Sequence, residues 1–204
     1  MKRGALRILL AVSLALPCAL RAQDTLLAQV LARLGSYPVV RADFSQERTL
    51  LGPERTLSGS GRIVFSRDAG LIWEMAEPVR AGLVITPSAL IETDAAGGRR
   101  LVRPGMVQAE IGRLVRGIMS GDVSELGSTF ELAARGEAER WTIDLVPRAP
   151  DMARYLRGVH LAGGRHLERI EIREASGEAT RIRMRNFTVA AALDADERRQ
   201  FLPP

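Results

Sequence analysis

Few residues in this sequence have the types and spacing that enzyme chemistry needs. The only histidines, His160 and His166, lie in the strand-like stretch RGVHLAGGRHLE, and no pair of residues has a spacing typical of metal ligands. Ser120 lies in GIMSG, which lacks the G-x-S-x-G turn that exposes a nucleophilic serine. The carboxylates are scattered along polar faces, where such groups are usually solvated rather than used in acid–base catalysis. The sequence therefore predicts a protein that is not an enzyme, with no metal and no cofactor.

One arginine, Arg67, occupies a position where a functional role has to be weighed. It follows the strand-like stretch GRIVFS and precedes GLIWEM, which carries Leu71 and Trp73. A lone arginine at a strand end is usually exposed to solvent. The alternative is that Arg67 faces inward, where its five N–H donors have partners to bind. For Leu71 and Trp73, the simplest interpretation is a place in the core.

The first 22 residues have the three parts of a secretory signal peptide. MKRG is positively charged, ALRILLAVSLALPCAL is an apolar run, and the small residue Ala22 suits cleavage. The run is shorter than the ~20 apolar residues of a membrane-spanning helix, which argues against the alternative of an uncleaved anchor. Cys18 does not indicate lipidation, because Pro17 stands where a lipoprotein signal needs a small residue. We expect cleavage after Ala22, a mature domain over residues 23–204 and a periplasmic location.

The mature chain is nearly neutral. Four of the 29 basic residues leave with the signal peptide, whereas all 24 acidic residues stay. The excess of basic residues in the full chain is therefore no evidence for nucleic-acid binding. Cys18 is the only cysteine, so the mature chain has neither disulfides nor thiolate chemistry. The remaining length suits one domain with a single core, and we expect a monomer.

Apolar residues alternate with polar ones along most of the chain. RTLSGSGRIVF places Ile63 and Phe65 on one face, and GLIWEM places Leu71, Trp73 and Met75 on one face. AGLVIT, ALIETD and ERWTIDLVP follow the same period, with glycine and proline between them. Short alternating strands with this punctuation predict an antiparallel sheet that curls or closes.

The stretch LERIEIREASGEATRIRMRNF predicts a hairpin whose register follows from its apolar face. Isoleucines face isoleucines if the loop has an odd length, such as Ser176-Gly177-Glu178. The charged face is then either a solvated outer surface or a surface that docks a partner or lipid headgroups. The charged pairs of the predicted register are Glu171 with Arg183, Arg173 with Arg181, and Arg169 with Arg185.

Two segments have helical spacing. DTLLAQVLARLGSY has an apolar stripe, Asp24 or Thr25 as an N-terminal cap and Gly35 as a stop. The second segment, from Pro104 to Ser120, also carries an apolar stripe, with Gly112 and Gly117 inside it. These glycines indicate either close packing or a helix that is held loosely enough to move. The second stripe consists of Val107, Ile111, Leu114, Val115, Ile118 and Met119.

An ordered set of motifs resembles the family of periplasmic outer-membrane lipoprotein carriers, LolA. The set consists of RADFSQER, GSGRIVFSRDAGLIWEMAEP, LVIT, WTIDLVPRA and the closing RQFLPP. Each piece is short, but together they span nearly the whole mature chain in the family's order. The individual positions that match are Phe44, Gln46, Gly61, Arg67, Trp73, Pro78, Phe201 and Pro203.

This resemblance implies a mainly β fold with helices, namely an incomplete antiparallel β-barrel of about eleven strands covered by a helical lid. It implies a carrier that binds acyl chains of lipoproteins in an apolar cavity. Such a carrier receives its cargo from an inner-membrane extraction complex and passes it to an outer-membrane receptor. In the family, the arginine that matches Arg67 lies under the lid and hydrogen-bonds it. The lid latch and lipid-binding residues that follow are Phe65, Arg67, Leu71, Trp73, Ile111, Leu114, Val115 and Ile118.

The chain also departs from the family's pattern. Asp68 stands where a proline is usual, Leu71 replaces a common aromatic residue, and TPSALIETDAAGG lacks a glycine- and aromatic-rich strand. We therefore expect a cavity of different shape, which leaves two other functions open. The first is a carrier or binder of another lipid, such as a glycolipid or a lipid made by a biosynthetic cluster. The second is a lipid-sensing regulatory module.

Overall fold

The computed structural model describes residues 16–51, 55–103, 114, 117, 118 and 123–204. Its helices are α1 (Leu16–Gly35), α3 (Val123–Thr129), α4 (Pro150–Ala153) and α5 (Ala195–Gln200). The strands in chain order are β1 (Val39–Leu50), β2 (Arg55–Ser66), β3 (Gly70–Glu77), β4 (Ala81–Ile85), β5 (Leu90–Thr93), β6 (Arg99–Val102), β7 (Phe130–Glu137), β8 (Arg140–Pro147), β9 (Leu156–Gly163), β10 (Leu167–Glu174) and β11 (Ala179–Ala190).

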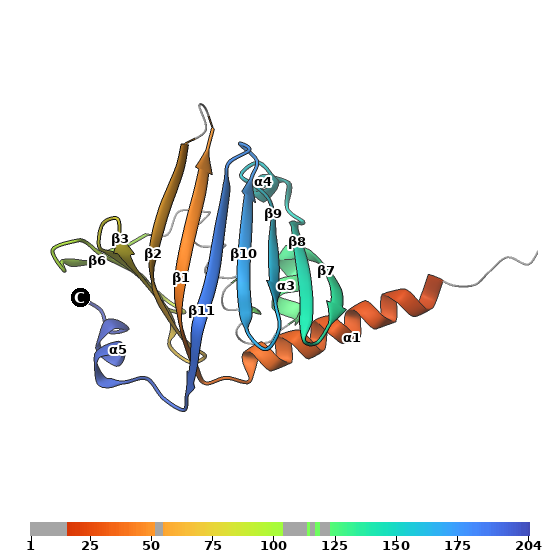
Figure 1. The fold of residues 1–204 in the computed structure, drawn as a ribbon, viewed down its shortest axis with the longest axis horizontal. Coiled ribbons are helices and arrows are strands. Elements are labelled where there is room, and N and C mark those ends of the chain that lie inside the picture. The colour runs from red at the N-terminus through yellow and green to blue at the C-terminus, as the bar shows by residue number, and fades with distance from the viewer. Residues whose placement is uncertain (1–15, 52–54, 104–113, 115–116, 119–122) are drawn as a thin grey trace, which may run out of the picture.

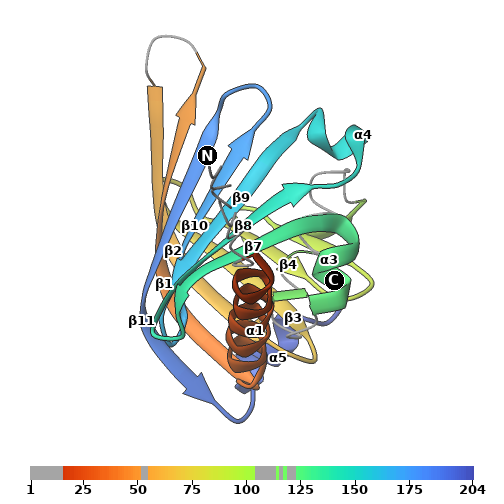
Figure 2. The same cartoon turned by 90° about the vertical axis from the view of Figure 1, so that its right-hand side faces the viewer.

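All eleven strands form one antiparallel sheet in the order β6-β5-β4-β3-β2-β1-β11-β10-β9-β8-β7. Pairing of β1 with β11 joins the two halves of the chain at the middle of the sheet. The sheet curls without closing, so β6 and β7 remain as edges (Figure 2). The predicted incomplete barrel of about eleven antiparallel strands is confirmed.

Helix α1 packs by the apolar stripe that the sequence predicts. Leu27, Val30, Leu31 and Leu34 are buried against residues of β7, β8 and β9, and the helix ends at Gly35 as expected. The predicted start at Asp24 or Thr25 is wrong, because the helix already begins at Leu16. The physical reason is that Pro17 lies in the first turn, where proline is tolerated, and no helix breaker separates it from Gly35. Figure 1 shows the N-terminal part of α1 projecting beyond the sheet.

Most of the second predicted helix, Pro104 to Ser120, lies outside the described residues. Leu114, Gly117 and Ile118 are described and helical, and the two apolar side chains are buried in the cluster that includes α1. A methyl group on Gly117 would come within 2.5 Å of a methyl carbon of Leu126 in α3. Close packing therefore explains Gly117, and the partner is a helix rather than the sheet.

The two faces of the sheet have separate apolar clusters. On the face around which the sheet curls, here called the inner face, α1 and α3 cover β7 to β9 (Figure 2). On the outer face, Leu193 and Phe201, which flank α5, pack on a smaller cluster. That outer cluster consists of Val39, Val64, Ile72, Val84 and Ile91.

The register predicted for the β10–β11 hairpin is wrong by two residues. Arg169 lies opposite Arg183 and Glu171 opposite Arg181, while Ile170 faces Ile182, so the apolar faces still match. The difference comes from the turn. Gly177 has a φ of 100°, a conformation that glycine adopts without strain at the last position of a three-residue hairpin loop. The loop is therefore Ala175-Ser176-Gly177, closed by hydrogen bonds between Glu174 and Glu178 and between Gly177 and Glu174.

Candidate functional site

The strongest candidate site is an apolar surface on the inner face of β1 to β5 and β11. Alternating residues of these strands point to one side and form a continuous cluster, because side chains i and i+2 share a face of a strand. None of the buried members has a titratable side chain, which suits an apolar ligand rather than catalysis. The buried members are Val40, Ala42, Phe44, Ile63, Phe65, Leu71, Ile85, Leu90, Ile182 and Met184.

Phe44 and Trp73 form the aromatic part of this surface. Their ring centroids are 4.1 Å apart and the rings are tilted by 39°. Gly61 lies between them and the neighbouring strand: a methyl group there would be 1.9 Å from the carbonyl oxygen of Glu74 and 2.9 Å from the ring of Phe44. The glycine therefore allows β2 to pass closely beside the aromatic pair. Phe44 is buried, whereas Trp73 is half-buried and keeps part of its ring accessible.

Exposure of the inner face increases toward the β1–β2 hairpin. On β1, Val40, Ala42 and Phe44 are buried, whereas the positions from Gln46 to Leu50 are only half-buried. On β2, Phe65 is buried and Leu57, near the hairpin, is 54 % exposed. The apolar surface is therefore closed at the end where β1 begins and open at the end of the hairpin.

The structure brings together three of the predicted site residues. Phe65 and Leu71 are 4 % and 7 % exposed, lie opposite each other on β2 and β3, and share the inner cluster with Trp73. Period-two alternation was enough to place these side chains on one face.

The predicted lid residues are only partly described. Leu114 and Ile118 are buried with α1, α3 and β7 to β9, beside the part of the inner face that holds Phe65 and Leu71. Leu167 and Ile170 pack against both clusters and connect them. Ile111 and Val115 lie outside the described residues. Contact between this helix and Leu71 or Trp73 therefore stays a prediction.

Arg67 lies in the turn between β2 and β3 with its side chain exposed. Its backbone N–H donates to the carbonyl of Pro38 at 3.0 Å, which fixes the turn against the start of β1. Its guanidinium forms no hydrogen bond or ion pair with any residue that the structure describes. The latch between Arg67 and a lid stays a prediction.

Sequence reasoning left several residues of the inner surface out of the site. Val40, Ala42 and Phe44 alternate in the stretch VVRADF, and Ile182 and Met184 alternate in RIRMR. The alternation was visible, but only pairing of β1 with β11 shows that these residues continue the surface formed by Phe65 and Leu71.

The outer face holds a groove of a different kind. Its volume is about 1120 Å³ and it lies over β2 to β5 beside the end of α5. Arg62 and Glu74 in its wall form an ion pair at 2.9 Å, and Gln200 donates to Glu74 at 2.9 Å. Charged groups that already bind one another make this groove unsuitable for acyl chains.

Other polar clusters serve structural roles. His160 and Asp144 are joined at 2.7 Å on the outer face, and Arg135 donates to the same carboxylate at 2.5 Å. Burial raises the pKa of Asp144, but the hydrogen bonds from His160 and Arg135 outweigh it and leave the pKa below its usual value. Among the described side chains, no group of three or more His, Cys, Asp or Glu residues is placed to hold a metal ion.

A buried ion pair fastens α5 to the sheet. Arg41 of β1 donates from Nε and Nη2 to the two carboxylate oxygens of Glu197, both at 2.6 Å. Glu197 is 1 % exposed and also closes a capping box with Asp194. The hydrogen bonds from Arg41 hold the pKa of Glu197 below its ordinary value despite burial. Sequence reasoning missed this pair, because Arg41 and Glu197 are far apart in the chain.

Within the described segments, no helix combines the length and the apolar composition that crossing a membrane requires.

Comparisons with known proteins agree with the fold. The chain is 24% identical over 184 residues to an outer-membrane lipoprotein carrier protein of Chromohalobacter salexigens, covering 90% of this chain and 86% of the relative. Among solved structures, it resembles the LolA superfamily protein NE2245 of Nitrosomonas europaea, with a TM-score of 0.47, 10% identity and coverage of 84% and 95%. It also resembles the MucA/MucB complex of Pseudomonas aeruginosa, with a TM-score of 0.44, 13% identity and coverage of 89% and 60%.

The family model described as outer membrane lipoprotein carrier protein LolA matches residues 36–198. This range includes all eleven strands of the sheet and the apolar inner surface. The match covers most of the chain, and the protein therefore belongs to the LolA family.

Proposed function

We propose that this protein is a periplasmic carrier that binds the acyl chains of lipoproteins on the inner face of its sheet and moves them from the inner to the outer membrane. The observation that supports it most directly is the inner cluster of buried apolar side chains, which contains no buried charge. An acyl chain gains free energy of about 0.8 kcal/mol for each methylene group that it buries. Binding of this kind needs neither a cofactor nor a catalytic group.

The opening of the inner face supports a route for the cargo. Side chains are buried near the start of β1 and become exposed toward the β1–β2 hairpin. An acyl chain can therefore enter at the hairpin end and lie along Phe44, Leu71 and Trp73. Family membership supports the same role, since the name of the family is that of a lipoprotein carrier.

The proposal includes export and two partners. A signal peptide over residues 1–22 would be cleaved, leaving residues 23–204 as one monomeric domain. The projection of the N-terminal part of α1 beyond the sheet supports this, because the residues of α1 that pack into the cluster begin at Leu26 (Figure 1). An inner-membrane complex would load the carrier and an outer-membrane receptor would unload it.

Binding can be tested with a fluorescent fatty acid and a charge placed on the inner surface. Leu71→Asp puts an unpaired carboxylate among apolar side chains, which costs several kcal/mol if it stays ionised. We expect probe affinity to fall by about tenfold or more, which corresponds to about 1.4 kcal/mol or more. Leu101→Asp is the control, because Leu101 is 57 % exposed at the edge strand β6.

A second variant separates binding from folding. Trp73→Ala removes a half-buried ring, so the sheet keeps more of its packing than in Leu71→Asp. Weaker probe binding in both variants, with circular dichroism spectra like that of the wild type, supports the site. Unchanged probe affinity in both variants would show that the inner surface is core alone.

The cargo can be identified by mass spectrometry of the protein purified from periplasm. Recovery of triacylated lipoprotein supports the proposed cargo. Recovery of a lipid without attached protein would assign the carrier to another lipid. The same spectra show whether residues 1–22 have been removed.

A further inference from the structure

The outer face of the β10–β11 hairpin is a ridge of arginines. With Ile170, Ile172, Ile182 and Met184 on the inner face, the alternate positions of both strands point outward. Five of these six outward positions are arginine and one is glutamate. We call them the arginine ridge: Arg169, Glu171 and Arg173 on β10, and Arg181, Arg183 and Arg185 on β11.

The acidic neighbours of the ridge compensate only part of its charge. Glu171 is contacted by Arg173 at 2.8 Å and by Arg181 at 3.6 Å. Glu47 of β1 lies 3.7 Å from Arg183, at the edge of ion-pair distance. Asp43 of β1 is opposite Arg185 but accepts a hydrogen bond from Asn186 at 2.7 Å. Across the described residues, Arg169 and Arg185 have no ion-pair partner.

The cross-strand register adds a like-charge pair. Arg169 lies directly opposite Arg183, and like charges at such positions destabilise a sheet. Both side chains are exposed, so no packing in the core requires an arginine at either position. A carboxylate at position 169 would be the stabilising choice. The arrangement favours binding of an external anion over stability of the hairpin.

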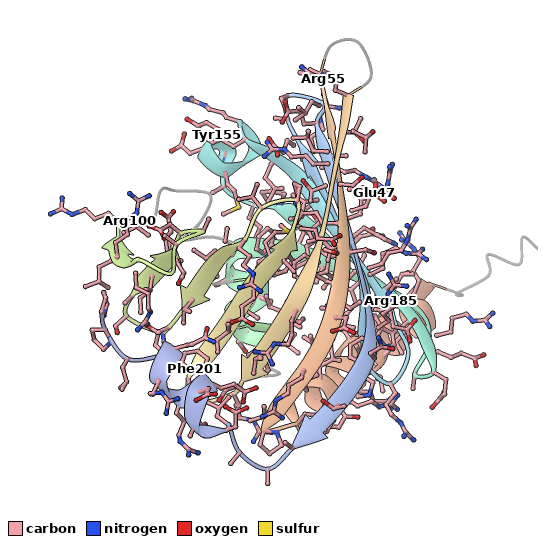
Figure 3. The ribbon with its side chains drawn as sticks, turned by 60° about the vertical axis from the view of Figure 1, so that its left-hand side comes forward. Glu47, Arg55, Arg100, Tyr155, Arg185 and Phe201 are labelled. Atoms are coloured by element: carbon pink, nitrogen blue, oxygen red, sulfur yellow. The ribbon has the colours of Figure 1, made fainter. Side chains whose placement is uncertain are left out.

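The shape of the sheet indicates what kind of surface can reach the ridge. β1 is the central strand of the eleven, and β11 and β10 are the next two. The sheet curls toward the inner face, so these strands form the crest of the convex outer face (Figure 2). Figure 3 shows Glu47 and Arg185 pointing away from the molecule on this side. A flat surface would touch the protein first along this crest.

We propose that the arginine ridge docks the protein on the surface of an anionic phospholipid bilayer. The outward positions of β10 and β11 contain no apolar or aromatic residue, whereas protein interfaces usually contain such anchors at their centre. A bilayer surface requires only charge, and each arginine near an anionic membrane contributes to binding. The guanidinium group also matches the geometry of phosphate oxygens.

This inference does not depend on the acyl-chain site. The ridge and the inner cluster lie on opposite faces of the same strands, so substitutions on one face leave the other side chains in place. Docking on the outer face leaves the inner face and its open end free. The ridge would therefore hold the protein near a membrane while cargo enters or leaves elsewhere.

The experiment compares two triple variants that lose the same charge. Arg169→Gln, Arg183→Gln and Arg185→Gln together remove three charges from the ridge. Arg100→Gln, Arg154→Gln and Arg199→Gln remove three exposed charges from β6, from the residue after α4 and from α5. Full-length mature protein is mixed with vesicles of phosphatidylglycerol and phosphatidylcholine, or of phosphatidylcholine alone, and sedimented at low and high salt.

We expect the wild type and the control variant to bind the anionic vesicles at low salt and to dissociate at high salt. We expect the ridge variant to bind about tenfold more weakly or worse. Its melting temperature should not fall, because the Arg169–Arg183 repulsion is removed, and its affinity for a fluorescent fatty acid should be unchanged. Loss of fatty-acid binding in the Leu71→Asp variant with normal vesicle binding would separate the two sites.

Three outcomes would overturn the proposal. Equal loss in both triple variants would show that net charge rather than the ridge matters. Absence of binding by the wild type to anionic vesicles would also exclude it. Displacement from vesicles by a small amount of polyglutamate, at equal concentration of negative charge, would instead favour an acidic protein as the partner.

Discussion

Gly61 is placed where any side chain would collide with the neighbouring strand. The nearest atoms to an added methyl group are the backbone carbonyl of Glu74 and the ring of Phe44. Neither a backbone carbonyl held in a sheet nor a buried ring can move away without disturbing the inner surface. The identity of this residue therefore decides how closely β2 and β3 pack beside the aromatic pair.

We expect Gly61→Ala to lower the free energy of unfolding by about 1–3 kcal/mol or more, because a close contact must be relieved by backbone movement. Gly127→Ala is the matched control: it lies in α3, nothing is within 4 Å of the added methyl group, and alanine favours a helix by up to about 1 kcal/mol. Urea denaturation of both variants tests this. A Gly61→Ala protein as stable as the wild type would contradict the geometry.

The exposed position of Arg67 makes a different prediction. Arg67→Leu should change the free energy of unfolding by no more than about 0.5 kcal/mol, since its guanidinium has no partner in the described part of the chain. The latch hypothesis requires more. If Arg67 holds a lid closed, Arg67→Leu should bind lipid more tightly and transfer it to acceptor vesicles more slowly. Equal affinity and equal transfer rates would show that Arg67 is an ordinary surface residue.

Among the secondary-structure elements, α5 depends on one residue for its attachment. Its helix has only six residues, too few to be stable without tertiary contacts. Glu197 caps the helix through Asp194 and binds Arg41 of β1, while Phe201 packs on the outer cluster. The capping box and the ion pair use the same carboxylate, so both are lost together if Glu197 changes.

We expect Glu197→Ala to destabilise the protein by about 3–5 kcal/mol, because it leaves Arg41 without its partner and removes the cap. Arg41 is 22 % exposed, so water compensates part of the loss and the lower end of the range applies. A double-mutant cycle with Arg41→Met measures the coupling between the two residues. Additive effects of the two substitutions would show that the ion pair contributes nothing to attachment of α5.

At the scale of the whole molecule, ionised groups connect distant parts of one sheet. Glu197 joins α5 to β1, Asp144 joins β8 to β7 and β9, and Glu171 joins β10 to β11. Hydrogen bonds from arginine, and for Asp144 also from His160, hold the pKa of each carboxylate below its ordinary value. Burial, followed by the charge of Arg165, lowers the pKa of His166, which stacks on Phe187.

These shifts predict that acid destabilises the protein. For the three carboxylates, the stabilisation is complete above their unfolded pKa values of about 4 and is lost as the pH falls through the lower folded values. His166 acts in the same direction, because the unfolded chain takes up its proton below about pH 6.5 more readily than the folded protein does. We therefore expect the urea midpoint to fall from pH 7 toward pH 3 (~). Glu197→Gln should flatten the acid part of this curve, and a midpoint that rises with acid would refute the assignment.

Local patterns in the sequence determined the type of most elements. Alternation of apolar residues predicted the antiparallel sheet and placed Phe65, Leu71 and Trp73 on one face, because a strand repeats every two residues whatever it pairs with. Helical spacing predicted the stripe of α1 and its end at Gly35. The motifs from RADFSQER to RQFLPP identified the family that the comparisons confirm.

Only the tertiary structure decided which of these elements meet. Pairing of β1 with β11 extended the apolar surface to Phe44 and Met184, and docking of α5 joined Arg41 to Glu197, which local periodicity cannot encode. The hairpin register depended on Gly177, whose backbone conformation sets the loop, and two residues of shift preserve the same apolar face. The sequence by itself thus determined the faces of the strands, while long-range pairing decided which faces became the inner surface and the arginine ridge.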